Sequence, residues 1–335
     1  MITIKRPNRP ILFDSTLVVE EVKRQELFYY EDPKLREESK FKPLFKINRK
    51  LREILASSFN HKCAFCESLL IDKYSVVERF RPSIKAMDLK GKISEEHYWW
   101  LRYEWDNLFP ICSECNKNKS NLFPIKGKRS LPGTTGDDLN KEIPLLINPC
   151  FDIPEKHFFY DFNSGLMISN TERGRITIDV YGLNRHSLIE QRKIEIQKFT
   201  GKVNHFILNL KQLNKSSNIN DLDSYLKLEE EELFNMFKMN TYPYLLLKRQ
   251  YILKTLNSNL DLMDKLTFKV EWEKLLTSYP VIQDKQQQNA LIKYKDYLVK
   301  GDDYNLNNKT KLDLYFRKSL YIEKIEIKIL RLLKV

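Results

Sequence analysis

The sequence predicts an α+β fold that is mostly helical and is built around a small zinc-bound core. Two motifs, Cys63-Ala-Phe-Cys66 and Cys112-Ser-Glu-Cys115, have the spacing of paired zinc knuckles. Short β-branched and aromatic runs follow the second pair and favour small sheets. From about residue 185, apolar residues recur at helical spacing, and no glycine occurs between Gly201 and Gly301.

The composition bounds the class of protein. The chain has 335 residues, of which 42% are hydrophobic, so it can fold as two domains or one large one and is not globally disordered. No apolar run approaches the ~18 residues of a membrane span, so we expect no membrane association. The N-terminus lacks the apolar stretch of a secretory signal, which predicts a cytoplasmic protein. The net charge of +12 favours a polyanionic partner, nucleic acid first.

Residues 1–60 are predicted to form a mostly helical, basic segment. Apolar residues near its end are spaced three and four apart, which indicates an amphipathic helix that leads into the first cysteine pair. These residues are Leu44, Ile47, Leu51, Ile54 and Leu55.

Residues 61–125 hold both cysteine pairs, and we predict that Cys63, Cys66, Cys112 and Cys115 bind one structural zinc ion. Disulfides are the weaker alternative, because a cytosolic chain with this spacing favours metal. Cys150 is left over and is expected to be a small buried residue.

Residues 126–184 are predicted to be an extended and hairpin segment that completes this domain. Glycines and a proline before residue 137 indicate a loop, and residues 143–149 a short strand. Aromatic residues 158–162, a turn, and residues 166–168 predict a hairpin. The β-branched run at 175–180 is expected to be another strand.

Residues 185–335 are predicted to form a C-terminal helical region that serves either as packed core or as a partner-docking surface. One helix carries an apolar stripe, and further helices are expected around 222–240, 243–256, 285–300 and 310–333. The stripe consists of Phe199, Val203, Phe206, Ile207, Leu210 and Leu213.

The cysteine-bounded segment resembles the zinc-stapled form of the HNH, or ββα-metal, nuclease motif. The resemblance is carried by residues 77–82, 105–108 and 116–119. It implies that Glu78 and Asn116 hold one divalent cation and that Asn107 braces the loop. Phosphodiester cleavage requires a cation to neutralise developing charge, and such oxygen ligands suit Mg²⁺ or Mn²⁺.

Basic residues of the motif are expected to hold the nucleic-acid backbone. Arg79, Arg81 and Lys119 are the candidates for binding phosphate, with Lys119 one helical turn beyond Asn116. For any one of them, a solvated basic face is the alternative interpretation.

Arg79 departs from the family pattern, because it stands where the family has its catalytic histidine. Arginine stays protonated and cannot act as a general base. His97 is the nearest spare histidine in the sequence and is a candidate for that role; otherwise it is a surface residue in the first turn of a helix.

A tighter resemblance, over residues 45–192, is to the PtuB-type HNH proteins of Septu and retron anti-phage systems. Residues 62–67, 98–108 and 144–149 carry it, together with Tyr181-Gly-Leu-Asn-Arg185. It implies a nuclease that cuts nucleic acid, with DNA favoured over RNA, and that works with an ABC or SMC-like ATPase of the PtuA type. The alternative is a zinc-stabilised module that binds nucleic acid or the ATPase without cutting. A transcription regulator is a third hypothesis, but no helix-turn-helix signature supports it.

Overall fold

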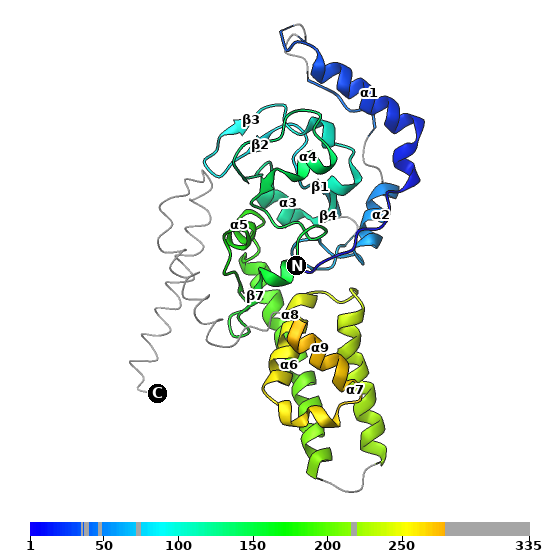
Figure 1. Cartoon of the computed structure of the whole chain (residues 1–335), viewed down its shortest axis with the longest axis vertical. Helices are drawn as coiled ribbons and strands as arrows, with labels where there is room; N and C mark the ends of the chain where they lie inside the picture. Colours follow the sequence, from blue (N-terminus) through cyan, green and yellow to red (C-terminus); the bar gives the residue numbers. More distant parts are fainter. Residues whose placement is uncertain (35, 37–39, 46–48, 72–74, 216–219, 279–335) are drawn as a thin grey trace, which may run out of the picture.

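The computed structural model describes residues 1–34, 36, 40–45, 49–71, 75–215 and 220–278 (Figure 1). It confirms a mostly helical α+β fold with small sheets. In Figure 1 the helices after residue 185 form a bundle at one end of the molecule, while the N-terminal helix lies at the other end. Within the described ranges, no helix combines the length and the apolar character needed to cross a membrane.

A two-stranded antiparallel sheet and the helix that follows it form the centre of the N-terminal half. Strand β1 (Ser75–Arg79) pairs with β4 (Leu108–Cys112), so that Glu78 lies opposite Phe109. Helix α3 (Ser113–Lys119) begins directly after β4 and packs on both strands. The elements therefore succeed one another in space as strand, strand and helix.

Three further sheets, each of two short strands, surround this centre. They pair β2 (Ala86–Met87) with β3 (Ile93–Ser94), β5 (Ile125–Lys126) with β6 (Ile143–Pro144), and β7 (Phe159–Tyr160) with β8 (Met167–Ile168). The last pair is the hairpin that the sequence predicts, while the expected strand at 143–149 is only two residues long. Short helices join these strands, namely η3 (Trp99–Leu101), η4 (Trp105–Asn107), α4 (Gly136–Asn140) and η5 (Pro154–Lys156).

The N-terminal segment is less helical than its sequence predicts. It contains η1 (Ile11–Asp14), α1 (Thr16–Tyr30) and α2 (Arg49–Ser58), whereas residues 1–10 and the described part of 31–45 are irregular. The amphipathic helix begins at Arg49, and Leu51 and Leu55 on it are buried in a small core with Phe13 and Trp105. Leu44 lies before that helix and is 71% exposed.

The expected strand at 175–180 is wrong, because these residues belong to helix α5 (Glu172–Val180). The side chain of Thr171 accepts a hydrogen bond from the Gly174 amide and caps the helix N-terminus. At the other end, Gly182 has a left-handed backbone (φ +58°) and Leu183 N–H donates to the Ile178 carbonyl. These two caps outweigh the β preference of Ile176, Thr177, Ile178 and Val180.

The C-terminal helical region contains α6 (His186–Lys215), α7 (Asn220–Lys238), α8 (Leu245–Asn257), η6 (Leu260–Lys265) and α9 (Lys269–Ser278). The predicted stripe on α6 is buried from Phe199 to Leu210, and Leu213 packs at its edge. Helix α6 contacts both α7 and α8, so within the described residues the stripe serves as packed core. The helices predicted around 285–300 and 310–333 lie outside the described residues.

Two residues that flank the first cysteine pair join the two halves of the molecule. The Lys62 ammonium donates to the Tyr242 carbonyl, at 2.8 Å. The Glu67 carboxylate accepts hydrogen bonds from the Leu245 and Leu246 amides, at 2.7 and 3.3 Å, and so caps the N-terminus of α8. The cysteine knuckle is therefore one of the places where the helical region attaches, and the hairpin that contains β7 is another, since Gln250 of α8 donates to the Phe158 carbonyl and accepts from the Tyr160 amide.

The buried lysine at this junction predicts a pH-dependent stability. Burial lowers the pKa of Lys62 to about 8, whereas an unfolded lysine titrates near ~10.4. Between these values the unfolded chain binds more protons, so the free energy of unfolding rises with pH, on the order of 3 kcal/mol over the window. Urea unfolding of the native chain and Lys62→Met between pH 7.5 and 10.5 checks this. The native curve should rise relative to the Lys62→Met curve, and parallel curves would contradict the prediction.

Candidate active site and metal centre

Four cysteine sulfurs gather where the first knuckle meets α3. The Sγ atoms of Cys63, Cys66, Cys112 and Cys115 all lie within 4.8 Å of one another, and three of the four residues are buried. The prediction that these four cysteines come together is confirmed. All of them are free thiols, so the disulfide alternative is wrong.

The geometry and chemistry of this cluster fit a zinc ion. A tetrahedral site with Zn–S bonds of ~2.3 Å has sulfur–sulfur edges of about 3.8 Å, and Cys66 Sγ lies 3.8 Å from Cys112 Sγ. Hydrogen bonds from the other three thiols, Cys112 first, hold the pKa of Cys66 well below its usual value. Zinc binds the deprotonated thiol, so this shift favours metal binding at Cys66, whereas burial raises the pKa of Cys63 and a hydrogen bond with Cys112 raises that of Cys115.

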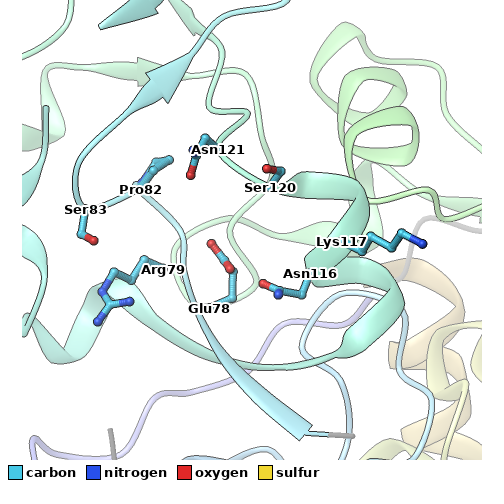
Figure 2. Close-up of a pocket in the computed structure, with 8 residues that line it drawn as sticks. All are labelled: Glu78, Arg79, Pro82, Ser83, Asn116, Lys117, Ser120 and Asn121. Carbon is cyan, nitrogen blue, oxygen red and sulfur yellow. The ribbon is translucent and has the colours of Figure 1, made fainter. Parts of the chain in front are cut away.

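A second site is an open hollow of about 430 Å³ at the end of β1, on the side of α3. Figure 2 shows Glu78 from β1 and Asn116 from α3 side by side, with the Asn116 amide directed toward Glu78. Arg79, Pro82 and Ser83 line the β1 side of the hollow, and Lys117, Ser120 and Asn121 line the helix side. The Asn116 side chain makes no hydrogen bond to another described residue, so its amide oxygen is available to a ligand.

The buried ammonium of Lys119 fixes the orientation of Glu78. Lys119 Nζ is fully buried and donates to Glu78 Oε1 at 2.9 Å, to the Arg79 carbonyl at 3.0 Å and to the Ser120 carbonyl at 3.4 Å. Three acceptors satisfy the three protons of an ammonium group. In this structure Lys119 is therefore a brace beneath Glu78, whereas the sequence predicts that it contacts phosphate.

Arg79 lines the hollow but directs its guanidinium away from the Glu78 carboxylate (Figure 2). Its Nε donates to the Arg102 carbonyl at 3.0 Å. Burial, with the positive charge of Arg102 as a smaller cause, lowers the pKa of Arg79 to about 10. Arg79 is thus still a cation at neutral pH and is unable to accept a proton there.

Asn107 ties together the two segments that flank the hollow. Its side chain accepts a hydrogen bond from the Arg81 amide at 2.7 Å and donates to the Arg81 and Leu101 carbonyls, both at 2.9 Å. The Arg81 guanidinium is itself paired with the buried carboxylate of Glu142, at 2.9 Å, and that carboxylate also accepts from Tyr98. Arg81 therefore serves in an internal ion pair in this structure.

His97 does not line the hollow. It precedes the N-cap of η3 rather than lying within a helix, and its Nε2 is 2.9 Å from the Ser130 carbonyl. This contact requires a proton on Nε2. Burial lowers the pKa of His97, so the imidazole is neutral at pH 7. The structure thus does not bring His97 together with Glu78 and Asn116.

Several residues of these sites were missed by the sequence analysis. Ser83 and Asn121 line the hollow, and Glu142 holds Arg81 in place. Arg185 lies over the cysteine sulfurs. Neither spacing nor residue type marks these positions, except that Arg185 closes the quoted run Tyr181-Gly-Leu-Asn-Arg185.

Comparison with curated proteins finds similarity to two proteins of Bacillus mycoides (strain KBAB4). The chain is 30% identical to Septu protein PtuA over 303 residues, which cover 83% of this chain and 39% of that protein. It is 35% identical to Septu protein PtuB over 147 residues, which cover 42% of this chain and 49% of that protein. The chain thus spans less than half the length of either relative. No protein-family model matches it. No solved structure matches it.

Proposed function

We propose that the protein is a metal-dependent HNH endonuclease that acts in anti-phage defence. The observation that carries the proposal is the pairing of Glu78 with Asn116 across an open hollow, on a strand–strand–helix unit beside a tetrathiolate cluster. The similarity to Septu proteins PtuA and PtuB supports the defence role.

Glu78 and Asn116 would hold the catalytic Mg²⁺ or Mn²⁺. One carboxylate oxygen and one amide oxygen are hard ligands that suit these ions, and the open hollow leaves room for water and a phosphate. When bound, the cation supplies charge neutralisation and lowers the pKa of a bound water. Lys119 keeps the Glu78 carboxylate in place and Asn107 keeps the loop in place, while the positive charge of Arg79, which lines the hollow, would attract the phosphate backbone.

The partners are part of the proposal. The basic chain suits nucleic acid, with DNA favoured over RNA, and the PtuB-type resemblance implies an ABC or SMC-like ATPase as activator. Both relatives are named as Septu proteins and come from one strain, which supports a partnership between proteins of these two types.

The second candidate function is a zinc-stabilised module that binds nucleic acid or the ATPase and does not cut. The observation that favours it is Arg79, which stands in the place of the catalytic histidine. None of the residues that line the hollow is a histidine that could act as a general base.

Three proteins assayed on one DNA and one RNA substrate test the proposal: the natural chain, Arg79→His and His97→Ala. Because a positioned base contributes ~10²–10⁴-fold, Arg79→His is expected to raise Mg²⁺- or Mn²⁺-dependent cleavage by a factor in that range. His97→Ala should cleave like the natural chain, since His97 lies outside the hollow.

Loss of cleavage in His97→Ala would instead make His97 the base. If none of the three proteins cuts DNA or RNA with either ion, even with the ATPase present, the nuclease proposal fails and the binding-module hypothesis stands.

A further inference from the structure

One guanidinium group lies over the cysteine cluster from outside. Arg185 Nη1 is 3.4 Å from Cys115 Sγ, and Nη2 is 3.7 Å from Cys112 Sγ and 3.8 Å from Cys66 Sγ. The forked group thus donates to three of the four sulfurs. Arg185 Nη1 also donates to the Gly182 carbonyl, at 3.2 Å, which holds the fork in position.

The turn between α5 and α6 is shaped to bring Arg185 to this place. The Tyr181 ring at its start stacks on Phe65, which belongs to the first knuckle, with ring centroids 3.9 Å apart. Gly182 follows with φ +58°, and a Cβ atom there would lie 2.7 Å from the Asn118 side chain on α3. The turn therefore packs against Phe65 of the first knuckle and Asn118 of α3, and its left-handed backbone at residue 182 favours glycine.

We propose that Arg185 is the counter-cation of the zinc–tetrathiolate centre and that it determines how tightly the chain retains zinc. A zinc ion with four thiolates carries a net double negative charge, and a buried charge is costly unless it is paired and hydrogen-bonded. Arg185 supplies both the charge and the donors from the second coordination shell. This proposal concerns zinc retention alone, so it stands or falls independently of nuclease activity.

The position of Arg185 also links the metal centre to the helical region. Arg185 immediately precedes α6, which spans His186–Lys215 and packs on α7 and α8. Glu67, next to the first cysteine pair, caps α8. The N-termini of α6 and α8 are therefore both anchored beside the cysteine cluster, α6 through Arg185 and α8 through Glu67. Retention of zinc therefore stabilises the junction between the two halves of the molecule.

Competition for zinc between the purified full-length chain and a chromophoric chelator tests the proposal. Loss of a residue that contacts metal ligands typically weakens metal affinity ~10–100-fold, and we expect this for Arg185→Met. Arg185→Lys should lie between the native chain and Arg185→Met, because lysine keeps the charge but lacks the fork. The control Lys193→Met removes a partly exposed, ion-paired cation from α6, the helix that follows Arg185, and should retain zinc like the native chain.

Zinc affinity of Arg185→Met within twofold of the native value would overturn the proposal, as would Arg185→Lys binding no more tightly than Arg185→Met. A second measurement covers the case in which Arg185→Met does not fold. In Co²⁺-loaded Arg185→Lys, the sulfur-to-metal charge-transfer bands should shift while the tetrahedral d–d bands persist. Charge-transfer bands that coincide with those of the native protein would mean that Arg185 does not act on the sulfurs, and would also overturn the proposal.

Discussion

Replacement of Glu78 or Asn116 is expected to abolish metal-dependent cleavage, because each change removes or weakens one of the two side-chain ligands that we propose for the catalytic cation. A bound cation stabilises the transition state by several kcal/mol. Because each ~1.4 kcal/mol changes the rate tenfold, the cleavage rate should fall on the order of 10³-fold or more. Cleavage rates of the natural chain, Glu78→Gln and Asn116→Ala with saturating Mn²⁺ measure this effect.

Glu78→Gln is the sharper variant because of the residue beneath it. Lys119 is fully buried and ion-paired with Glu78, and removal of one partner of such a pair typically costs about 3–5 kcal/mol of stability. Glu78→Ala would therefore confuse loss of the cation with loss of the fold. A glutamine keeps an oxygen for the Lys119 ammonium and removes only the charge that attracts the divalent cation.

Glu114→Gln is the matched control for this change. Glu114 lies in the first turn of α3, is exposed and does not line the hollow, so cleavage should be unaffected. Zinc content should match the natural chain in all variants. The melting temperature of Glu114→Gln should also match it, whereas Glu78→Gln, in which the buried Lys119 loses its ionic partner, should melt lower and is assayed below its own melting temperature. A Glu78→Gln protein that cuts at the natural rate would exclude Glu78 as a metal ligand.

The cysteine cluster was predictable from sequence because its signal is local and discrete. Two Cys-x-x-Cys pairs supply four thiols of the kind that bind one zinc ion, and few other sites have this spacing. The four sulfurs lie together as expected. The α6 stripe was predictable for a similar reason, since the helical period carries through residues from Phe199 to Leu210 and burial follows it.

Helix α5 was mispredicted because the deciding interactions lie outside the β-branched run. The run from Arg175 to Val180 has the composition of a strand, yet the cap at Thr171 and the left-handed turn at Gly182 close a helix around it. Tertiary contacts of the Tyr181 ring then hold that turn on the first knuckle. The β propensity of these residues predicted the wrong element because it contributes less free energy than the two caps and the tertiary contacts of the helix.

The roles of the basic residues were not predictable, because they depend on burial. Arg79, Arg81 and Lys119 have the same charge and lie near one motif, which made all three candidates for phosphate. In the structure Lys119 is fully buried against Glu78, and Arg81 is paired with Glu142, which is distant in sequence. Only Arg79 of the three lines the hollow.

Replacement of Cys115 with serine is expected to cause the largest loss of stability. The four cysteine sulfurs join the knuckle before β1 to helix α3, and one of these sulfurs is lost in the variant. Structural zinc contributes roughly 10–16 kcal/mol of binding free energy in small zinc-binding peptides, so loss of the ion should destabilise this half of the molecule by at least several kcal/mol. Metal analysis should find about one zinc per native chain and little in Cys115→Ser.

Cys150→Ser is the matched control, because Cys150 is a free, partly buried cysteine outside the cluster. It should keep the zinc and change the melting temperature little. Both variants make the same chemical change, and the replacement of a buried thiol alone costs far less than the loss of a zinc ion, so a large difference between them assigns the stability to the metal. Because the knuckles also anchor α6 and α8, amide exchange in Cys115→Ser should accelerate at the first turns of both helices. If Cys115→Ser has the same melting temperature as Cys150→Ser, and if amide exchange at the first turns of α6 and α8 stays as slow as in the native chain, the fold does not depend on the metal.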